Sequence, residues 1–219
     1  MKTLFIEAKS SKKISLPKEL IASLPKHVAL FTTVQFIDNS KSIIKQLKKA
    51  NIDVEIIRPD HCVYDCQLLG CSIKRFEKDV DAFLYVGDGE FHPKALMLKN
   101  EKPVFVYNPF SDKHFKLDKE EVEILKKKQK GAMLKFLTSK EIGILITTKP
   151  GQYNMKAAEN LKKNHADKNF YLIVADTIDF NSLQDFPFIE CFVNTACPRI
   201  GYDDSIKLPK PVINVEEII

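Results

Sequence analysis

Short apolar runs alternate with amphipathic segments along most of this sequence, and that alternation constrains the fold more than any other feature. The run VALFTTVQF (28–36) is rich in β-branched and aromatic residues, whereas NSKSIIKQLKKAN (39–51) places its apolar residues at helical spacing. Near-continuous apolar strands separated by helices are typical of a parallel sheet covered on both faces. We therefore predict an α/β fold with mainly parallel sheets in three-layer α/β/α domains.

The same order of elements returns in the second half of the chain. The segment IGILITTKPGQYN (142–154) resembles the first run, with a strand, a Thr-Thr pair and a glutamine, and MKAAENLKKN (155–164) ends in the same Leu-Lys-Lys as the first helix. An internal repeat near half the chain length implies two similar α/β domains. In this alignment the strands of DAFLYVGDGEFHP (81–93) and ECFVNTACPRI (190–200) correspond. The remaining predicted elements are strands at 52–58, 104–109, 169–177 and 211–218 and a helix at 93–100.

A charged helical stretch separates the two copies. In DKEEVEILKKKQKGAMLKFLTSK (118–140) the acidic residues come first and the lysines later, the order that suits a helix dipole. We predict an α/β domain at 1–112, a helical connector at 113–140 and a second α/β domain at 141–219. The net charge of +5 is mild, and the lysine run is expected to be a solvated face, so no direct nucleic-acid binding is predicted.

The sequence shows no membrane segment and no export signal. No apolar run approaches the roughly 20 residues that a membrane span needs, and the apolar part of the N-terminus is too short for a signal peptide. A cytoplasmic protein without membrane contact is expected. In a reducing compartment its five cysteines would stay free, bind metal or react.

Three of the five cysteines, Cys62, Cys66 and Cys71, lie within ten residues of one another, which favours a site. Thiolates bind zinc, copper(I) and iron–sulfur clusters. No CxxC pair is present, so structural zinc has weak support, whereas iron–sulfur ligation tolerates wide spacing and needs three or four thiolates. Three thiolates would leave one iron open to a substrate. The alternative is a buried thiol acting as a small apolar side chain, which fits Cys191 best.

Polar residues follow the strand that ends in VGDGEFHP (86–93). In an open α/β sheet, ligands bind at the carboxyl ends of the strands. Gly87 and Gly89 would permit close approach of a small molecule, and Asp88 could accept hydrogen bonds from it. His92 could face the same cleft or make a structural hydrogen bond. The loop could equally be a tight turn without a ligand.

Other polar residues could contribute, although none receives a catalytic role. Arg199, shortly after Cys197, could hold a carboxylate in a bidentate fork, and Gln35 and Gln152 could add neutral hydrogen bonds. The pair Asp203-Asp204 could act as two carboxylates or belong to a surface turn. The sequence contains no serine-hydrolase elbow, Walker loop or dinucleotide fingerprint, which disfavours kinases, ATPases and nicotinamide dehydrogenases.

Together these motifs resemble the diphthamide-synthesis family, the 2-(3-amino-3-carboxypropyl)histidine synthases. The matching segments, in the family's order, are FIEAK (5–9), TTVQF (32–36), QLLGC (67–71), DAFLYVGDGEFHP (81–93), TTKPGQ (147–152) and ACPRIGYDD (196–204). The resemblance implies a [4Fe–4S] cluster held by three cysteines, one from each of three similar domains, whose open iron engages S-adenosylmethionine.

The resemblance also implies a noncanonical radical SAM reaction. The reduced cluster would break the bond between sulfur and the γ-carbon and release a 3-amino-3-carboxypropyl radical, which adds to a histidine of translation elongation factor 2. A homodimer and an electron donor are implied as partners.

The resemblance departs from the family pattern in one respect. The matches cover the family's second and third domains, so we expect a shortened form that lacks the first domain and its cluster cysteine. Cys71 and Cys197 match the two other ligands; Cys66 is the predicted third ligand, with Cys62 as the alternative. The residues expected to line an S-adenosylmethionine pocket between the domains are Gly87, Asp88, Gly89 and His92, with Gln35, Gln152 and Arg199 as further candidates.

The resulting prediction is an iron–sulfur, S-adenosylmethionine-dependent 3-amino-3-carboxypropyl transferase acting on a histidine of elongation factor 2 or a related acceptor. Two alternatives stay open. The chain could be a non-catalytic partner subunit of a full-length family member, or a zinc or thiol protein on the same fold. Iron, sulfide and zinc content would separate the three.

Overall fold

The computed structural model describes residues 4 and 6–218, and the chain divides into two compact units, Met1–Val122 and Glu123–Ile219. Each unit has its own sheet and its own apolar core. Among the described helices, none combines the length and the apolar character that a membrane crossing requires.

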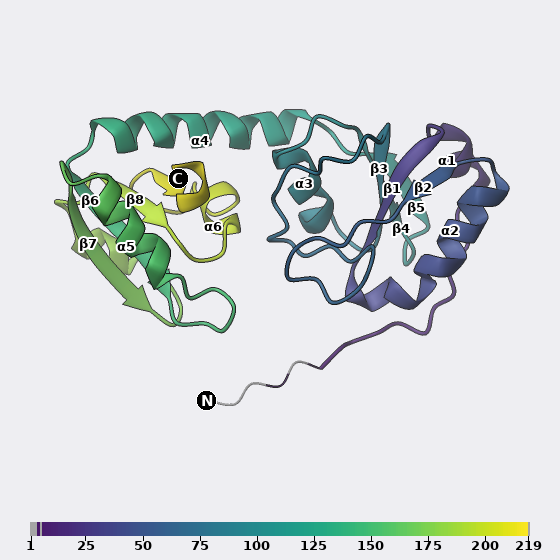
Figure 1. Ribbon diagram of the computed structural model, residues 1–219, viewed down its shortest axis with the longest axis horizontal. Helices are drawn as coiled ribbons and strands as arrows, with labels where there is room; N and C mark the ends of the chain where they lie inside the picture. The colour runs from purple at the N-terminus through teal and green to yellow at the C-terminus, as the bar shows by residue number, and fades with distance from the viewer. Residues whose placement is uncertain (1–3, 5, 219) are drawn as a thin grey trace. The chain divides into compact units, whose positions relative to one another are not determined.

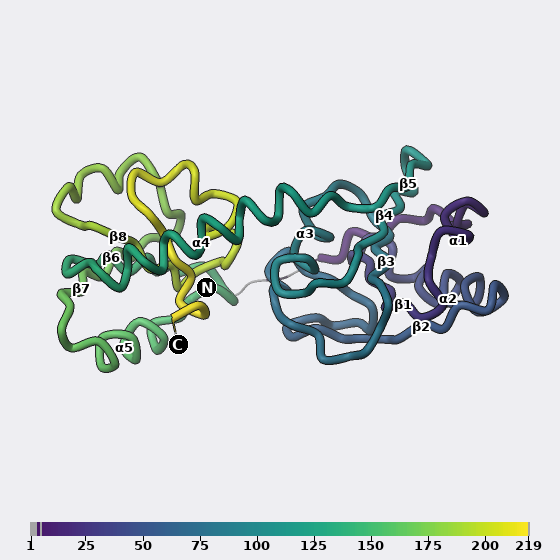
Figure 2. Tube along the Cα trace, turned by 90° about the horizontal axis from the view of Figure 1, so that it is seen from above, coloured from purple at the N-terminus to yellow at the C-terminus, as the bar shows by residue number. Residues whose placement is uncertain are grey.

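The first unit is built on a five-stranded sheet in the order β2-β1-β3-β4-β5. The strands are β1 (His27–Thr32), β2 (Asp53–Glu55), β3 (Ala82–Val86), β4 (Val104–Asn108) and β5 (Lys113–Lys116). The first four run parallel, and β5 is antiparallel to β4. Helices α1 (Lys18–Ser23) and α2 (Ser40–Lys49) lie on one face of this sheet, and α3 (Phe91–Leu98) lies on the other (Figures 1 and 2).

The two faces of the first sheet follow from the alternation of side chains along its strands. Leu30 and Leu84 are paired in register and pack with Leu47 of α2 in one buried cluster. Phe31 and Phe83 point to the opposite face, where their rings lie 5.8 Å apart. Both faces are therefore covered, as continuous apolar strands require.

The second unit has a four-stranded parallel sheet in the order β7-β6-β8-β9. The strands are β6 (Glu141–Thr147), β7 (Asn169–Ala175), β8 (Cys191–Asn194) and β9 (Val212–Asn214). Residues of α4 (Glu120–Thr138) and α5 (Met155–Asn164) pack on one face, and the segment around the 3-10 helix η2 (Ser182–Asp185) covers the other. The short helix α6 (Arg199–Tyr202) follows β8, and the 3-10 helix η3 (Val215–Glu217) follows β9.

The strand orders confirm the predicted fold class and the internal repeat. In each unit, the first strand in sequence lies between the second and the third, and the fourth lies beyond the third. Strands β3 and β8, which precede the loops 87–93 and 195–200, occupy the same place in the two sheets. The sequence alignment of these two loops therefore corresponds to a topological equivalence.

Three segments differ from the expected elements. One is 211–218, expected as a strand, in which β9 ends at Asn214 and the 3-10 helix η3 follows. The apolar run 28–36 ends as a strand at Thr32 and continues as the 3-10 helix η1 (Val34–Asn39), which buries Phe36 and Ile37 on one side. The range 113–140, expected as a helical connector, divides into strand β5 and helix α4. Strand β5 forms because its backbone pairs with β4, although all four of its side chains are exposed.

Strand β7 forms one edge of the second sheet. Its sequence NFYLIVA contains no charged residue. Leu172 is 43% exposed and Val174 49% exposed, while the Tyr171 ring packs 4.8 Å from Phe188. The edge therefore presents apolar side chains beside its outer backbone groups.

Candidate functional site

The loop that carries three of the cysteines is tied to the carboxyl end of β1. The Thr32 N–H donates to the Cys66 carbonyl at 2.8 Å, and the Leu68 N–H donates to the Thr32 carbonyl at 2.8 Å. These bonds form a short parallel bridge between Thr32 and Gln67. The Thr32 hydroxyl donates to the Val86 carbonyl at 2.7 Å. The end of β1 therefore connects the cysteine loop to β3.

Cys66 belongs to the core of the first unit. It is 2% exposed and packs in the apolar cluster that includes Leu47 of α2. Its N–H donates to the Ile57 carbonyl at 2.9 Å while its own carbonyl accepts from Thr32, and its φ is 63°, in the left-handed region. Burial raises the pKa of the Cys66 thiol to about 11. The structure thus surrounds this sulfur with apolar side chains.

Cys62 precedes Cys71 in the same loop. Its half-buried thiol donates to the Gln67 carbonyl at 3.3 Å, and it interacts with the Ser72 hydroxyl and the Leu69 N–H. Burial is the main cause that raises the pKa of Cys62; the two hydrogen bonds oppose that shift, and the neighbouring charge of Cys71 adds to it. Cys71 itself is exposed. Of these two thiols of one loop, Cys71 is thus the exposed one and Cys62 the half-buried one.

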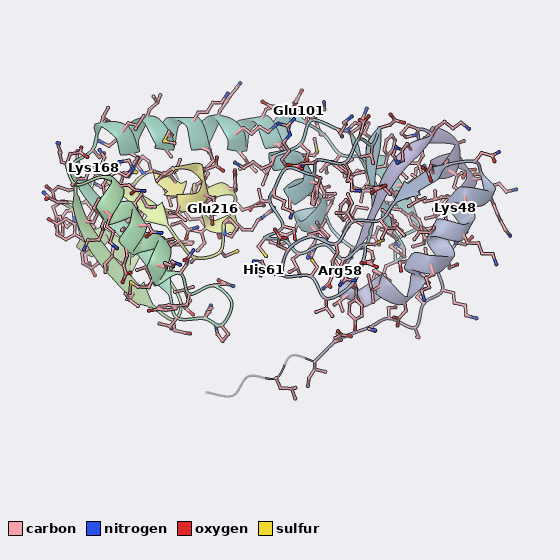
Figure 3. The ribbon with its side chains drawn as sticks, viewed as in Figure 1. Lys48, Arg58, His61, Glu101, Lys168 and Glu216 are labelled. Atoms are coloured by element: carbon pink, nitrogen blue, oxygen red, sulfur yellow. The ribbon has the colours of Figure 1, made fainter. Side chains whose placement is uncertain are left out.

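The turn that presents Cys62 is held by a buried amide. The Gln67 Oε1 accepts from the N–H groups of Val63 and Tyr64 at 2.8 and 3.0 Å. His61, directly before Cys62, has a φ of 63°, which non-glycine residues rarely adopt. Figure 3 labels His61 in the loop between β2 and β3. The backbone that follows Cys62 is thus held by two hydrogen bonds to one amide oxygen.

The Gly-Asp-Gly loop lies where β3 and β4 end. The Gly87 N–H still donates to the Tyr107 carbonyl at 3.0 Å, so the ladder continues through it. Asp88 is exposed, and its Oδ1 accepts from the Asn108 Nδ2 at 2.7 Å. Gly89 turns the chain with a φ of 66°, which glycine adopts without strain. The Asp88 carboxylate is therefore held at the carboxyl edge of the sheet.

Two aromatic rings fix His92 and connect its loop to the cysteine loop. The His92 ring stacks on Tyr85 with centroids 6.2 Å apart and an angle of 12°, and Phe91 lies nearly perpendicular to it at 5.3 Å. A Cβ atom at position 70 would overlap the Phe91 ring, so Gly70 allows this ring to approach. The structure thus brings the loop before Cys71 into contact with the loop of Asp88 and His92.

In the second unit, Cys197 is half-buried in the loop that follows β8. Asn194 donates to the Cys197 carbonyl at 2.9 Å and to the Asn214 Oδ1 at 2.7 Å, which ties the ends of β8 and β9 together. Arg199 is 4% exposed, and its Nη2 donates to the Asp203 Oδ1 at 2.7 Å. Burial lowers the pKa of Arg199, and the Asp203 carboxylate opposes that shift.

The neighbouring carboxylates Asp203 and Asp204 face different cations. Asp203 binds Arg199, whereas Asp204 binds the Lys207 ammonium at 2.7 Å. The remaining candidates are the two glutamines. Gln35 is half-buried in η1, and Gln152 is exposed in the turn after β6. Neither side chain makes a hydrogen bond to another residue in the part of the chain that the structure describes.

Within the part of the chain that the structure describes, no three His, Cys, Asp or Glu side chains gather into a metal-binding group. Phe5, the first residue of the FIEAK segment, lies outside the described residues. Cys191 is fully buried in the core of the second unit, as predicted.

Three supporting residues were not singled out from the sequence. Asn108 positions Asp88, Gln67 closes the turn at Cys62, and Tyr85 stacks on His92. Asn108 is the last residue of β4, so the rule that ligand-binding residues follow parallel strands would have found it. Gln67 belongs to the QLLGC segment. Its role depends on the N–H groups of Val63 and Tyr64, whose positions cannot be predicted from the sequence pattern.

Comparison with known proteins gives a consistent result. A family model described as "Putative diphthamide synthesis protein" matches residues 1–219. The chain is 33% identical over 196 residues to a 2-(3-amino-3-carboxypropyl)histidine synthase from Methanocaldococcus jannaschii, an alignment that covers 88% of this chain and 51% of the relative. It is 30% identical to subunit 1 of the corresponding synthase from Kluyveromyces lactis, covering 92% of this chain and 50% of that protein.

The fold of the chain is also similar to that of a solved protein structure. A crystal structure of Dph2 from Pyrococcus horikoshii with a 4Fe-4S cluster superposes with a TM-score of 0.75 and 27% identity, covering 90% of this chain and 57% of that one. The chain thus spans about half the length of the curated relatives it matches.

Proposed function

The chain belongs to the diphthamide-synthesis family, and we propose that it binds a [4Fe–4S] cluster and transfers the 3-amino-3-carboxypropyl group of S-adenosylmethionine. The observation that carries this proposal is the fold match over 90% of the chain to a Dph2 structure with a 4Fe-4S cluster. The acceptor would be a histidine of translation elongation factor 2 or a related ring. A homodimer and an external reductant belong to the same proposal.

Thiols of the chain would supply sulfur ligands to such a cluster. Cys71 is exposed, and the sulfur of its neighbour Cys62 interacts with the Leu69 N–H and the Ser72 hydroxyl. Sulfur ligands favour iron–sulfur clusters and other soft metals, and hydrogen bonds to the sulfurs tune a bound cluster. Cys71 and, in the second unit, Cys197 would be ligands. Each thiol would lose its proton on binding iron.

When bound, the cluster would supply the electron that breaks the bond between sulfur and the γ-carbon of S-adenosylmethionine. The overall exchange is redox-neutral, because the acceptor ring gains the aminocarboxypropyl group and releases one proton, while methylthioadenosine leaves. The residues of the chain would bind and orient the two substrates and keep water from the reacting carbon.

The loop after β3 would hold S-adenosylmethionine. Asp88 is fixed by Asn108 through one carboxylate oxygen, so the other oxygen could accept hydrogen bonds from the ammonium or ribose hydroxyl groups of the ligand. Gly87 and Gly89 would let the ligand approach the backbone there. His92, fixed by ring stacking, would line the same pocket.

Arg199 would have a positioning role. Its guanidinium already binds Asp203, so we propose that this pair holds the segment that follows Cys197. Gln35 and Gln152 would contribute neutral hydrogen bonds near the ends of their strands.

Anaerobic reconstitution with iron and sulfide tests the proposal. The protein should take up about four irons and about four sulfides per chain. Dithionite and S-adenosylmethionine should then yield methylthioadenosine. Formation of 5′-deoxyadenosine, or failure to bind iron under conditions that load a full-length relative, would contradict the proposal.

A second candidate function is a partner subunit without its own reaction. The relative from Kluyveromyces lactis is named a subunit, which favours assembly with another chain. In that case the protein would hold no cluster, would not bind S-adenosylmethionine and would co-purify with a full-length family member. The iron count separates the two functions.

A further inference from the structure

A side chain outside the set of proposed ligand residues lies at the carboxyl end of β1. Thr33 directly follows β1, and its hydroxyl oxygen is buried without a hydrogen-bond partner among the described residues. Thr33 also precedes η1, yet its side chain makes no capping hydrogen bond to that described helix. Buried hydroxyl groups in folded proteins nearly always have a partner, so an unpaired one indicates a place where a ligand or an ordered water binds.

Thr33 lies where the strand order of the first sheet reverses. Strand β2 lies on one side of β1 and β3 on the other, so successive connections leave β1 in opposite directions. In open α/β sheets, ligands bind at the carboxyl ends of the two strands that flank such a reversal. Strands β1 and β3 run side by side (Figure 1), and their last paired residues are Thr32 and Val86. Thr33 and Gly87 are therefore the next residues of the two strands, at the edge of the sheet where a ligand is expected.

The internal repeat provides a comparison for Thr33. The Thr-Thr pair at the end of β1 recurs as Thr147 and Thr148 at the end of β6. The first hydroxyl of each pair donates to a backbone carbonyl at 2.7 Å. The second hydroxyl differs between the units, because Thr148 is exposed and donates to the Asp176 carboxylate at 3.4 Å. Among these four described threonines, Thr33 is the one whose buried hydroxyl has no protein partner.

We infer that the Thr33 hydroxyl donates a hydrogen bond to the carboxylate of S-adenosylmethionine. This inference rests on the proposed function and adds which group of the ligand Thr33 recognises. Asp88 can only accept hydrogen bonds when ionised, so it suits the ammonium group of the ligand, whereas the ligand carboxylate requires a donor. A hydrogen bond to a charged acceptor is stronger than one between neutral groups. The ligand reaches Thr33 by displacing the protein atoms that cover its hydroxyl, and Gly87 and Gly89 allow the neighbouring loop to shift.

The test measures the affinities of reconstituted variants for two ligands by titration calorimetry. The ligands are S-adenosylmethionine and its decarboxylated form, which differ only in the carboxylate. Wild type should bind S-adenosylmethionine about tenfold more tightly than the decarboxylated ligand. Thr33→Val keeps the shape of the side chain without the hydroxyl, so it should bind S-adenosylmethionine about tenfold more weakly and lose most of this discrimination. Thr33→Ser keeps a hydroxyl and should keep the discrimination.

Two further measurements separate a ligand contact from a structural role. Thr148→Val removes the hydroxyl at the equivalent position of the second unit and should leave both affinities unchanged. Thermal unfolding without ligand examines the fold itself: the Thr33 hydroxyl has no protein partner among the described residues, so the midpoint of Thr33→Val should equal or exceed that of wild type. Thr32→Val removes a hydroxyl that is bonded to the Val86 carbonyl, so its midpoint should be lower.

The outcomes distinguish this inference from the proposed function. If wild type binds neither ligand, the proposed function fails. If wild type binds both ligands equally well, or if Thr33→Val keeps the wild-type affinities or weakens both to the same degree, only the contact of Thr33 with the carboxylate is overturned. A lower unfolding midpoint for Thr33→Val would overturn it as well, because the hydroxyl would then stabilise the fold.

Discussion

The ring of Phe91 lies against Gly70, so closely that a side chain at position 70 would overlap it. Gly70 directly precedes Cys71, and Phe91 is the first residue of α3, next to His92. This one contact joins the loop of the exposed thiol to the loop that would hold S-adenosylmethionine. Both partners therefore lie next to predicted site residues: Gly70 precedes Cys71, and Phe91 precedes His92.

We expect Gly70→Ala to destabilise the first unit by about 1 to 2 kcal/mol, because the Phe91 ring must shift to make room. In a Phe91→Ala background, Gly70→Ala should lower the free energy of unfolding by less, so the double-mutant cycle should show coupling between the two positions. Gly131→Ala is the control: no atom lies within 4 Å of the added Cβ, and alanine should stabilise that helix by about 0.5 to 1 kcal/mol. Denaturant unfolding of wild type, Gly70→Ala, Phe91→Ala, the double variant and Gly131→Ala measures these differences.

We expect the thiols of the metal-free protein to react with iodoacetamide in an order set by exposure and ionisation. Cys71 should react first because it is exposed. At pH 8, a pKa of about 11 leaves Cys66 ionised in roughly one molecule in a thousand, and Cys191, with a pKa of about 12, in still fewer. Raising the pH toward 11 should accelerate the Cys66 reaction by about tenfold per unit while the fold persists. Rapid labelling of Cys66 at pH 8 would contradict its buried position in the core.

Asp203→Asn should destabilise the second unit by about 2 kcal/mol. The change removes the carboxylate that neutralises the buried Arg199, although partial exposure of Asp203 reduces the cost below that of a fully buried pair. Asp204→Asn removes a carboxylate one residue away whose partner Lys207 is exposed, so its effect should be much smaller than that of Asp203→Asn. Thermal unfolding of the two variants tests the difference, and equal effects would contradict it.

Asn108→Ala should weaken binding of S-adenosylmethionine to the reconstituted protein by about three- to tenfold, since it removes the donor that orients Asp88. The iron count should not change, because Asn108 contacts no thiol among the described residues. Asn181→Ala, on the surface of the second unit, serves as a control. Isothermal titration provides the affinities, and an unchanged affinity for Asn108→Ala would contradict the assigned role of Asp88.

The order of elements was predictable because the spacing of apolar residues in each run is typical of either a strand or a helix. Runs such as 104–109 and 169–177 became strands β4 and β7 close to their expected positions. Strand β5 was not predictable from its sequence KHFK, because its side chains are exposed and only the pairing with β4 makes it a strand. Helix α1 has six residues, too few for a clear helical period.

The exposure of Cys62 and Cys66 was less predictable than their place in a loop. From the sequence, Cys66 was the predicted third ligand and Cys62 the alternative. What separates them is burial: Cys66 is 2% exposed in the apolar core, whereas Cys62 is half-buried, and the backbone bond from Thr32 of β1 to the Cys66 carbonyl could not be read from spacing. The burial of Cys191 was predictable because it lies inside a continuous apolar strand.

The charge-free edge strand β7 has a consequence for how the protein behaves when it is concentrated. Natural sheets usually protect an edge with a lysine, a proline or a bulge that discourages strand addition from another molecule. Leu172 and Val174 offer none of these, so intermolecular pairing should begin there, and a gatekeeper such as Leu172→Lys should raise the concentration at which aggregates form.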